Sequence, residues 1–218
     1  MLQTKTRWSL EGIAKDTVYW NNSSAIQNRL EALREAKADL VLFCECFPMT
    51  IETWLRNKIE GDDRGISRAI ELADKSIDSI CSVLAQQKMI HFDVHFRNIL
   101  TDGRSFFLSD FGLTLSSYFD LSKEELDFFE RHKNYDRAML ALSFMHGIFI
   151  TLFGTDHWVQ RLKEYMNGDY KILPNFIHDI ANKYGATALA MNEFFDALRK
   201  KSKLTPFPND SLHIDAVL

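Results

Sequence analysis

The stretch HFDVHFRNILTDGRSFFLSDFG, residues 91–112, carries the strongest structural signal in the chain. It contains two short apolar runs, at 99–101 and 105–109, and Asp102-Gly103 lies between them. An Asp-Gly pair between apolar runs favours a tight hairpin turn, because such a turn needs positive φ. The stretch therefore predicts an antiparallel β-hairpin.

Polar side chains flank the expected hairpin. Asn98 immediately precedes its first strand, and Asp110 immediately follows its second. The open ends of an antiparallel pair lie roughly 5 Å apart, so an amide oxygen and a carboxylate should lie side by side. A hard divalent cation such as Mg²⁺ prefers these oxygen ligands. Asp93, five residues before Asn98, would add a further carboxylate from the adjoining loop.

The order and spacing of these residues resemble the catalytic loop and magnesium-binding triplet of the protein-kinase-like superfamily. The resemblance is carried by His91-x-Asp93-x-His95-x-x-Asn98, followed by Asp110-Phe111-Gly112. The sequence is similar, more narrowly, to a bacterial family of kinase-like proteins with no well-defined substrate. The resemblance implies a mostly α (α+β) fold: a kinase-like C-lobe, which is a helical bundle with a small β-hairpin and a hinge strand.

The same resemblance implies a role for each residue of the motif. Asp93 would orient or deprotonate the hydroxyl of the acceptor, and Asn98 and Asp110 would bind Mg²⁺ that bridges the phosphates of ATP. His95 or Arg97 would touch the γ-phosphate. The implied cofactors are ATP and Mg²⁺. His91 would be structural and would hold the loop and the Phe111 region together.

Two further segments extend the resemblance. Residues 39–44 predict a buried strand that is similar to the last strand of a kinase N-lobe, and Glu45 to Phe47 would then form the hinge that binds adenine through its backbone. Asp136 precedes an apolar helix expected over 137–153. It should be buried and accept backbone N–H bonds from the loop near His91, so that its removal would cost about 1–3 kcal/mol.

Periodicity and turn residues predict the remaining elements. A short strand is expected at 7–10, and helices are expected at 25–36, 50–55, 66–87, from 122 onward, and at 137–153, 156–167, 175–184 and 187–201. The sixteen uncharged or apolar residues 138–153 fall short of the roughly 20 needed to cross a bilayer. They are expected to form a buried core helix rather than a membrane span.

A kinase also needs a Gly-rich loop over the phosphates, a strand lysine and a helix glutamate that pairs with it. The chain contains no G-x-G-x-x-G sequence, and about 38 residues precede the expected hinge strand. We therefore expect a truncated enzyme, weakly active or inactive alone. Residues 38–218 would be the C-lobe, and residues 1–37 a remnant that covers its top. Self-association, or a partner that completes the sheet, are the other ways to cover the exposed strand edge.

Composition excludes some classes and leaves others open. The 218 residues carry a net charge of −4, which excludes a basic surface for non-specific nucleic-acid binding. Three cysteines without a Cys-x-x-Cys pair predict neither a disulfide framework nor a structural zinc site. A cytoplasmic protein is expected, with no membrane. Three functions remain open: a phosphotransferase acting on a hydroxyl of a protein or small molecule, a non-catalytic pseudokinase-type binding or regulatory module, and a metal-dependent hydrolase.

Overall fold

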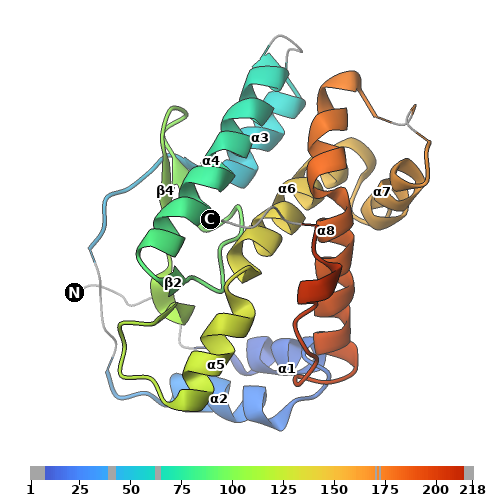
Figure 1. Ribbon diagram of the computed structural model, residues 1–218. Coiled ribbons are helices and arrows are strands. Elements are labelled where there is room, and N and C mark those ends of the chain that lie inside the picture. Colours follow the sequence, from blue (N-terminus) through green and yellow to red (C-terminus); the bar gives the residue numbers. More distant parts are fainter. Residues whose placement is uncertain (1–7, 39–42, 62–64, 170, 172, 214–218) are drawn as a thin grey trace. The chain divides into compact units, whose positions relative to one another are not determined.

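The structure is a computed structural model that describes residues 8–38, 43–61, 65–169, 171 and 173–213. It is mostly helical with small antiparallel sheets (Figure 1). The chain divides into two compact units. The first comprises Met1–Glu45 with Phe194–Pro206, and the second comprises Cys46–Glu193 with Phe207–Leu218. The hairpin and every residue around it belong to the second unit.

The described elements are these. The helices are α1 Leu10–Tyr19, α2 Ser24–Arg34, α3 Ile51–Ile59, α4 Ile66–Gln86, α5 Lys123–His132, α6 Tyr135–Phe153, α7 Trp158–Met166 and α8 Asn175–Lys200. The strands are β1 Met49–Thr50, β2 Met89–Ile90, β3 Ile99–Thr101, β4 Phe106–Leu108 and β5 Leu115–Ser116. Short 3-10 turns occupy η2 Phe111–Leu113 and η4 Asn209–Ser211. One sheet has the order β1-β3-β4, and β2 pairs with β5.

Helix α6 is the centre of the second unit, as the sequence predicted. It packs against α3, α4 and α7, and Figure 1 shows it crossing between α4 and α8. Its side chains Leu140, Phe144 and Ile148 are fully buried. Each such side chain contributes about 1.5–3 kcal/mol of burial free energy, so α6 anchors the elements that carry the hairpin.

By length and composition alone, the helical stretch Lys123–Phe153 could cross a membrane. That stretch combines α5 and α6, and 44% of its most apolar window is buried inside the protein. The core helix of a soluble protein meets the same criterion, so this is weak evidence for a membrane span. The expectations of no membrane contact and a cytoplasmic location stay predictions.

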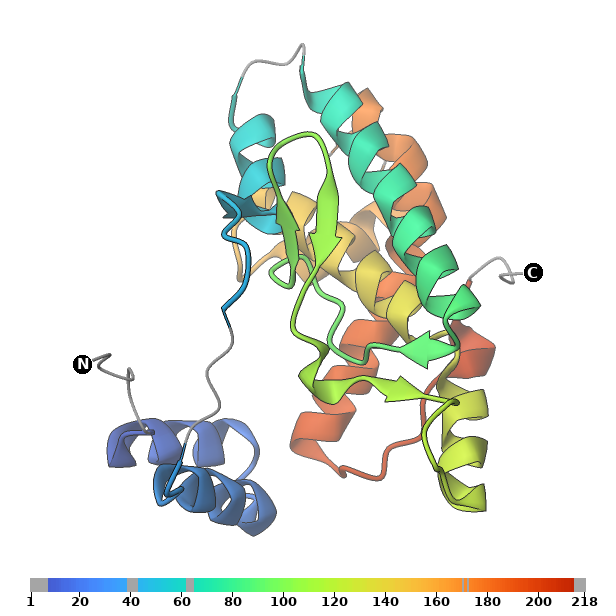
Figure 2. The same ribbon diagram turned by 90° about the vertical axis from the view of Figure 1, so that its left-hand side faces the viewer.

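The predicted hairpin is confirmed (Figure 2). Strands β3 and β4 pair with Ile99 opposite Leu108, and the second strand is shorter than expected, at Phe106–Leu108. Gly103 has φ +90° in the turn, which is the backbone conformation that the Asp-Gly pair was expected to supply. The Asp102 carboxylate accepts the backbone N–H groups of Arg104 and Ser105, both at 2.8 Å.

Thr101 closes the same turn from inside the core. It is fully buried, its hydroxyl donates to the carbonyl of Ser105 at 2.8 Å, and it accepts the N–H of Gly103 at 2.9 Å. We expect Thr101→Val to lower the free energy of unfolding by about 1–3 kcal/mol, because it keeps the shape and leaves both backbone groups unpaired. Urea unfolding measures the change. Thr101→Ser keeps the hydroxyl and should lose clearly less; equal losses would show that the hydroxyl bonds contribute nothing.

Two expected elements are wrong. The short strand expected at 7–10 is not present in residues 8–10: helix α1 begins at Leu10, and Ser9 caps it by accepting the N–H of Gly12 at 3.0 Å. The two helices expected at 175–184 and 187–201 are one helix, α8. Gly185 is not a break between them. A Cβ there would lie 2.7 Å from the sulfur of Met166, so glycine allows α7 to approach closely.

The expected hinge strand lies largely outside the described residues, which exclude 39–42. Phe43 and Cys44, its last two positions, have no regular structure, and Phe43 is 86% exposed. A strand therefore does not extend to Cys44. The chain becomes regular again at β1, which pairs with β3 in the register Met49 to Thr101.

The described regular elements of the first unit are α1, α2 and the end of α8. Helices α1 and α2 pack against each other, and cations from the C-terminal segment lie over the aromatic rings of α1 and its end. Arg199 lies 5.3 Å from the ring centre of Tyr19, and Lys203 lies 4.0 Å from that of Trp20. Cation–π contacts of this kind contribute roughly 0.5–1 kcal/mol each at exposed sites. These contacts connect Tyr19 and Trp20 with residues of the C-terminal segment within the same unit.

Candidate functional site

Asp136 in the first turn of α6 fixes the loop that precedes the hairpin. Its carboxylate is 5% exposed and accepts the backbone N–H of His91 at 2.7 Å and that of Phe92 at 3.0 Å. The prediction that Asp136 is buried and holds this loop is confirmed. Phe92 has φ 63°, a left-handed conformation that costs a residue with a Cβ roughly 1–2 kcal/mol. The two bonds to Asp136 help to offset that cost.

Burial raises the pKa of Asp136 to about 6, because a buried carboxylate loses its hydration, and the two backbone N–H donors partly oppose this shift. Protonation of Asp136 in the folded protein therefore begins near neutrality. Its ionised form depends on the two donors for its stabilisation. The loop and the acid are thus coupled electrostatically as well as by geometry.

His91 joins this loop to the far end of the hairpin. The ring is fully buried, its Nδ1 accepts the N–H of Asp93 at 3.3 Å, and its Nε2 lies 3.0 Å from the carbonyl of Ser109. Because Nδ1 accepts, Nε2 carries the proton and donates to Ser109. The ring also meets Phe111 edge to face at 5.0 Å. His91 therefore connects the loop with the Phe111 region, which is the structural role expected for it.

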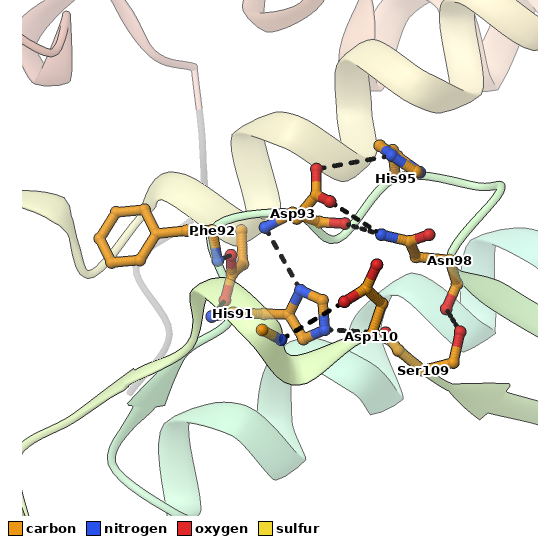
Figure 3. Close-up of polar contacts among 9 residues, drawn as sticks. His91, Phe92, Asp93, His95, Asn98, Ser109 and Asp110 are labelled. Atoms are coloured by element: carbon orange, nitrogen blue, oxygen red, sulfur yellow. Dashed lines mark hydrogen bonds and ion pairs between the residues drawn. The ribbon is translucent and has the colours of Figure 1, made fainter. Parts of the chain in front are cut away.

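Asp93, His95 and Asn98 form one hydrogen-bonded group (Figure 3). The Nδ2 of Asn98 donates to the backbone carbonyl of Asp93 and to its Oδ2, both at 3.0 Å. The other carboxylate oxygen, Oδ1, lies 3.4 Å from Nε2 of His95. The side chain of Asp93 remains 34% exposed. Its position is thus fixed by two neighbours while one face stays open to a reactant.

Asp110 follows the second strand at the same open end of the hairpin as Asn98. The Ser109 N–H and hydroxyl both donate to the carbonyl of Asn98, at 2.9 and 2.8 Å. Asp110 then turns with φ 60° and ψ 66°, and Figure 3 shows its carboxylate pointing toward the loop that carries Asp93 and Asn98. The hairpin thus brings Asn98 and Asp110 together, as its geometry predicted.

The oxygens of Asn98 and Asp110 fit a magnesium ion that is shared with a substrate. Asn98 uses its Nδ2 toward Asp93, which leaves its Oδ1 available, and Asp110 has one long contact, 3.4 Å from the N–H of Gly112 to Oδ1. No group of three or more His, Cys, Asp or Glu side chains suited to a metal occurs among the described residues. Mg²⁺ commonly takes one or two protein oxygens together with water and phosphate oxygens, and this donor set suits that mode.

Among the described residues, the other predicted site residues share no hydrogen bond or ion pair with this group. Arg97 is exposed in the turn before β3, and it lowers the pKa of His146, which burial lowers more strongly. In the part of the chain that is described, it shares no hydrogen bond or ion pair with Asp93. Phe47 stacks on Phe107 of β4 with ring centres 4.3 Å apart. Glu45 is exposed and belongs to the first unit.

Sequence reasoning missed Ser109 as a member of the site. Its hydroxyl and N–H both bond to Asn98, and its carbonyl accepts from His91. The available signal was its place as the last residue of the predicted second strand, next to Asp110, where a short hydroxyl side chain can reach across to the first strand. Ser109 therefore closes the hairpin end that holds the two candidate ligands.

The buried His91 ring gives a pH prediction. Burial lowers its pKa below the ordinary value, outweighing the opposing effects of the Ser109 carbonyl, Asp93 and Asp110. A histidine held neutral in the folded state stabilises above its unfolded pKa of about 6.5 and loses that contribution as the pH falls. We expect acidification from pH 7 to pH 5 to destabilise the protein through His91, and NMR titration should show its ring taking up a proton at a lower pH than a free histidine does.

Asp136 acts in the opposite direction, because its raised pKa favours folding as the pH falls from 6 toward 4. His91→Gln separates the two effects, since Gln keeps a donor and cannot titrate. Its free energy of unfolding should fall less between pH 7 and pH 5 than that of the natural chain. The same pH dependence in both proteins would exclude His91 as its source.

The case for a functional site at the open end of the hairpin comes from the geometry and the chemistry of its residues. A scan against protein-family models found no family that matches this chain, and a search of curated proteins found no match either.

Proposed function

We propose that this protein is a kinase-like phosphotransferase that transfers the γ-phosphoryl group of Mg²⁺-ATP to a hydroxyl acceptor on a protein or small molecule. One observation carries the proposal: Asp93, Asn98 and Asp110 meet at one end of a hairpin whose entry loop is fixed by Asp136 and His91. Phosphoryl transfer depends mainly on positioning and on charge neutralisation, and a fixed carboxylate beside two oxygen ligands suits both needs.

Each residue of the group then has a separate role. The open face of the Asp93 carboxylate would accept the proton of the acceptor hydroxyl, while Asn98 keeps that carboxylate in place. The Oδ1 of Asn98 and the carboxylate of Asp110 would hold the metal. Mg²⁺, when bound, would neutralise charge on the phosphates. His95, whose Nε2 lies 3.4 Å from Asp93, would contact the γ-phosphate.

Other assignments stay proposals with less support. Arg97 is exposed, and among the described residues it shares no contact with Asp93 that would direct it to the γ-phosphate. The backbone of residues 45–47 would contact adenine. His95 is the better candidate for a phosphate contact, because its Nε2 lies 3.4 Å from Asp93 and its side chain is 20% exposed.

A non-catalytic binding or regulatory module is the second candidate. This candidate is favoured because residues 8–38 of the first unit form two helices. They therefore supply no strand lysine that could hold the α- and β-phosphates of ATP. Such a module would keep the hairpin and loop as a nucleotide-binding or interaction surface without turnover.

The test is calorimetry with millimolar Mg²⁺-ATP. We expect weak, magnesium-dependent binding that Asp110→Ala abolishes, because this variant removes the only carboxylate of the proposed metal pair. Asp120→Ala removes an equally exposed carboxylate after β5 and should bind as the natural chain does. Tight binding without metal, or unchanged binding by Asp110→Ala, would contradict the proposal.

A further inference from the structure

A second concave site lies at the closed end of the same hairpin. It is a pocket of about 600 Å³ between α3, the first turns of α4 and the turn of the hairpin, three elements that lie together at one end of the second unit in Figure 2. The volume falls in the range that binds small molecules. We refer to it as the cationic pocket, for the side chains described next.

Four cationic side chains line this pocket, against one carboxylate. They are Lys58 of α3, Arg68 and Lys75 of α4, and Arg104 of the hairpin turn. Glu71 is the carboxylate, and Lys75 pairs with it at 2.6 Å. Lys58, Arg68 and Arg104 form no close ion pair among the described residues, although Arg68 helps to lower the pKa of Glu71 and Arg104 helps to lower that of Asp102. The lining still carries more positive than negative charge, and an anionic ligand would relieve the repulsion among its cations.

The floor of the cationic pocket offers a neutral donor as well. Trp54 is 6% exposed and lines the pocket, and it packs edge to face on Phe106 at 5.5 Å. Its indole Nε1 lies beside Gly103, 3.8 Å from where a Cβ would be, and the described part of the chain provides it with no acceptor. Because Trp54 lines the pocket, its indole N–H is available as a donor to a ligand.

The N-terminus of α4 adds to the same field. The N-cap residue Gly65 and Arg68 of the first turn line the cationic pocket, and among the described residues no side chain caps this 21-residue helix. N–H groups at a helix N-terminus and the helix dipole favour an anion there. The described lining therefore combines exposed cations, an indole donor and a helix terminus, all of which complement a negatively charged oxygen group.

We propose that the cationic pocket binds a small phosphorylated molecule. Phosphate is favoured because arginine presents two parallel donors to its oxygens, and Arg68 and Arg104 approach from different elements. The apolar part of the lining, Trp54, Ala69 and Leu72, would contact the organic part of the ligand. A concavity of this volume fits a small molecule better than an extended acidic peptide, which would need a long groove.

The proposal does not depend on the proposed kinase function. The three-residue strands of the hairpin separate its turn from Asn98 and Asp110 by roughly 10 Å. The two sites can therefore be tested separately in one protein, with metal left out so that the magnesium site does not contribute.

Calorimetry in chelator-containing buffer with inorganic pyrophosphate tests the site. We expect binding by the natural chain, at least about tenfold weaker binding by Arg68→Gln, and weaker binding again when Lys58→Gln is added. Both residues are exposed, so the variants should keep the fold. Lys123→Gln, which removes one exposed cation from α5, is the matched control and should bind normally.

Indole resonances in ¹H–¹⁵N NMR locate the ligand. The resonance missing from Trp54→Phe is assigned to Trp54, and pyrophosphate should shift that resonance in the natural chain. Asp110→Ala should bind pyrophosphate as tightly as the natural chain. The proposal is overturned by absence of binding at millimolar pyrophosphate, by unchanged affinity of Arg68→Gln, by loss of binding in Asp110→Ala, or by tighter binding of hexaglutamate than of pyrophosphate.

Discussion

Replacing Asp136 with alanine is expected to lower the free energy of unfolding by about 2–6 kcal/mol, because two buried N–H donors each lose their acceptor at about 1–3 kcal/mol. The donors are those of His91 and Phe92. A loss of this size is a large part of the stability of an ordinary domain. We also expect the left-handed conformation of Phe92 to relax, since nothing else in the described contacts holds its N–H.

Urea unfolding followed by circular dichroism measures this loss. Asp136→Asn keeps one carbonyl acceptor and should be intermediate, while Asp127→Ala removes an exposed carboxylate of α5 and should change stability by less than about 0.5 kcal/mol. If Asp136→Ala is as stable as Asp127→Ala, the carboxylate does not hold the loop.

Asp93→Asn is expected to reduce phosphoryl transfer or ATP hydrolysis at least about 100-fold, because a general base contributes about 10²–10⁴ to a rate. An asparagine keeps an oxygen that can accept from Asn98, so the loop should stay in place. Magnesium-dependent ATP binding should therefore be nearly unchanged. Turnover of the natural chain is itself expected to be slow, so release of labelled γ-phosphate over hours is the suitable measurement.

The outcomes separate the two proposed functions. Turnover by Asp93→Asn equal to that of an active natural chain would remove Asp93 from its catalytic role. Binding of Mg²⁺-ATP by the natural chain, with turnover no higher than that of Asp93→Asn, would instead favour the non-catalytic module. His95→Gln is the companion variant: it removes the ring 3.4 Å from Asp93 and should reduce the rate less.

The parts of the fold that sequence could predict were those with strong local signals. The Asp-Gly turn fixed the hairpin, the long apolar run of α6 identified the core helix, and Ser122 with Glu125 gave the capping box that begins α5. By contrast, β1 and the pair β2–β5 are two residues long. Strands of that length have no periodicity to read, and distant pairing partners determine them.

In the candidate site, too, the contacts between residues close in sequence were the predictable ones. Asp93 and Asn98 are five residues apart on one loop, so their contact followed from local spacing. The contact between Asp136 and residues 91–92 spans more than forty residues and was predicted through resemblance alone. The role of Ser109 depends on a bond across the hairpin end. The exposure of Arg97 depends on how its turn packs, which no local pattern determines.

The first unit is assembled from two stretches that are distant in sequence, Met1–Glu45 and Phe194–Pro206. A module made from one continuous stretch can be gained, lost or exchanged by a single recombination event. This unit cannot, since Arg199 and Lys203, which lie over Tyr19 and Trp20, are encoded far from them. Natural variation at the two stretches should therefore be correlated, and a chimaera that replaces one stretch alone should lose the contacts that the other supplies.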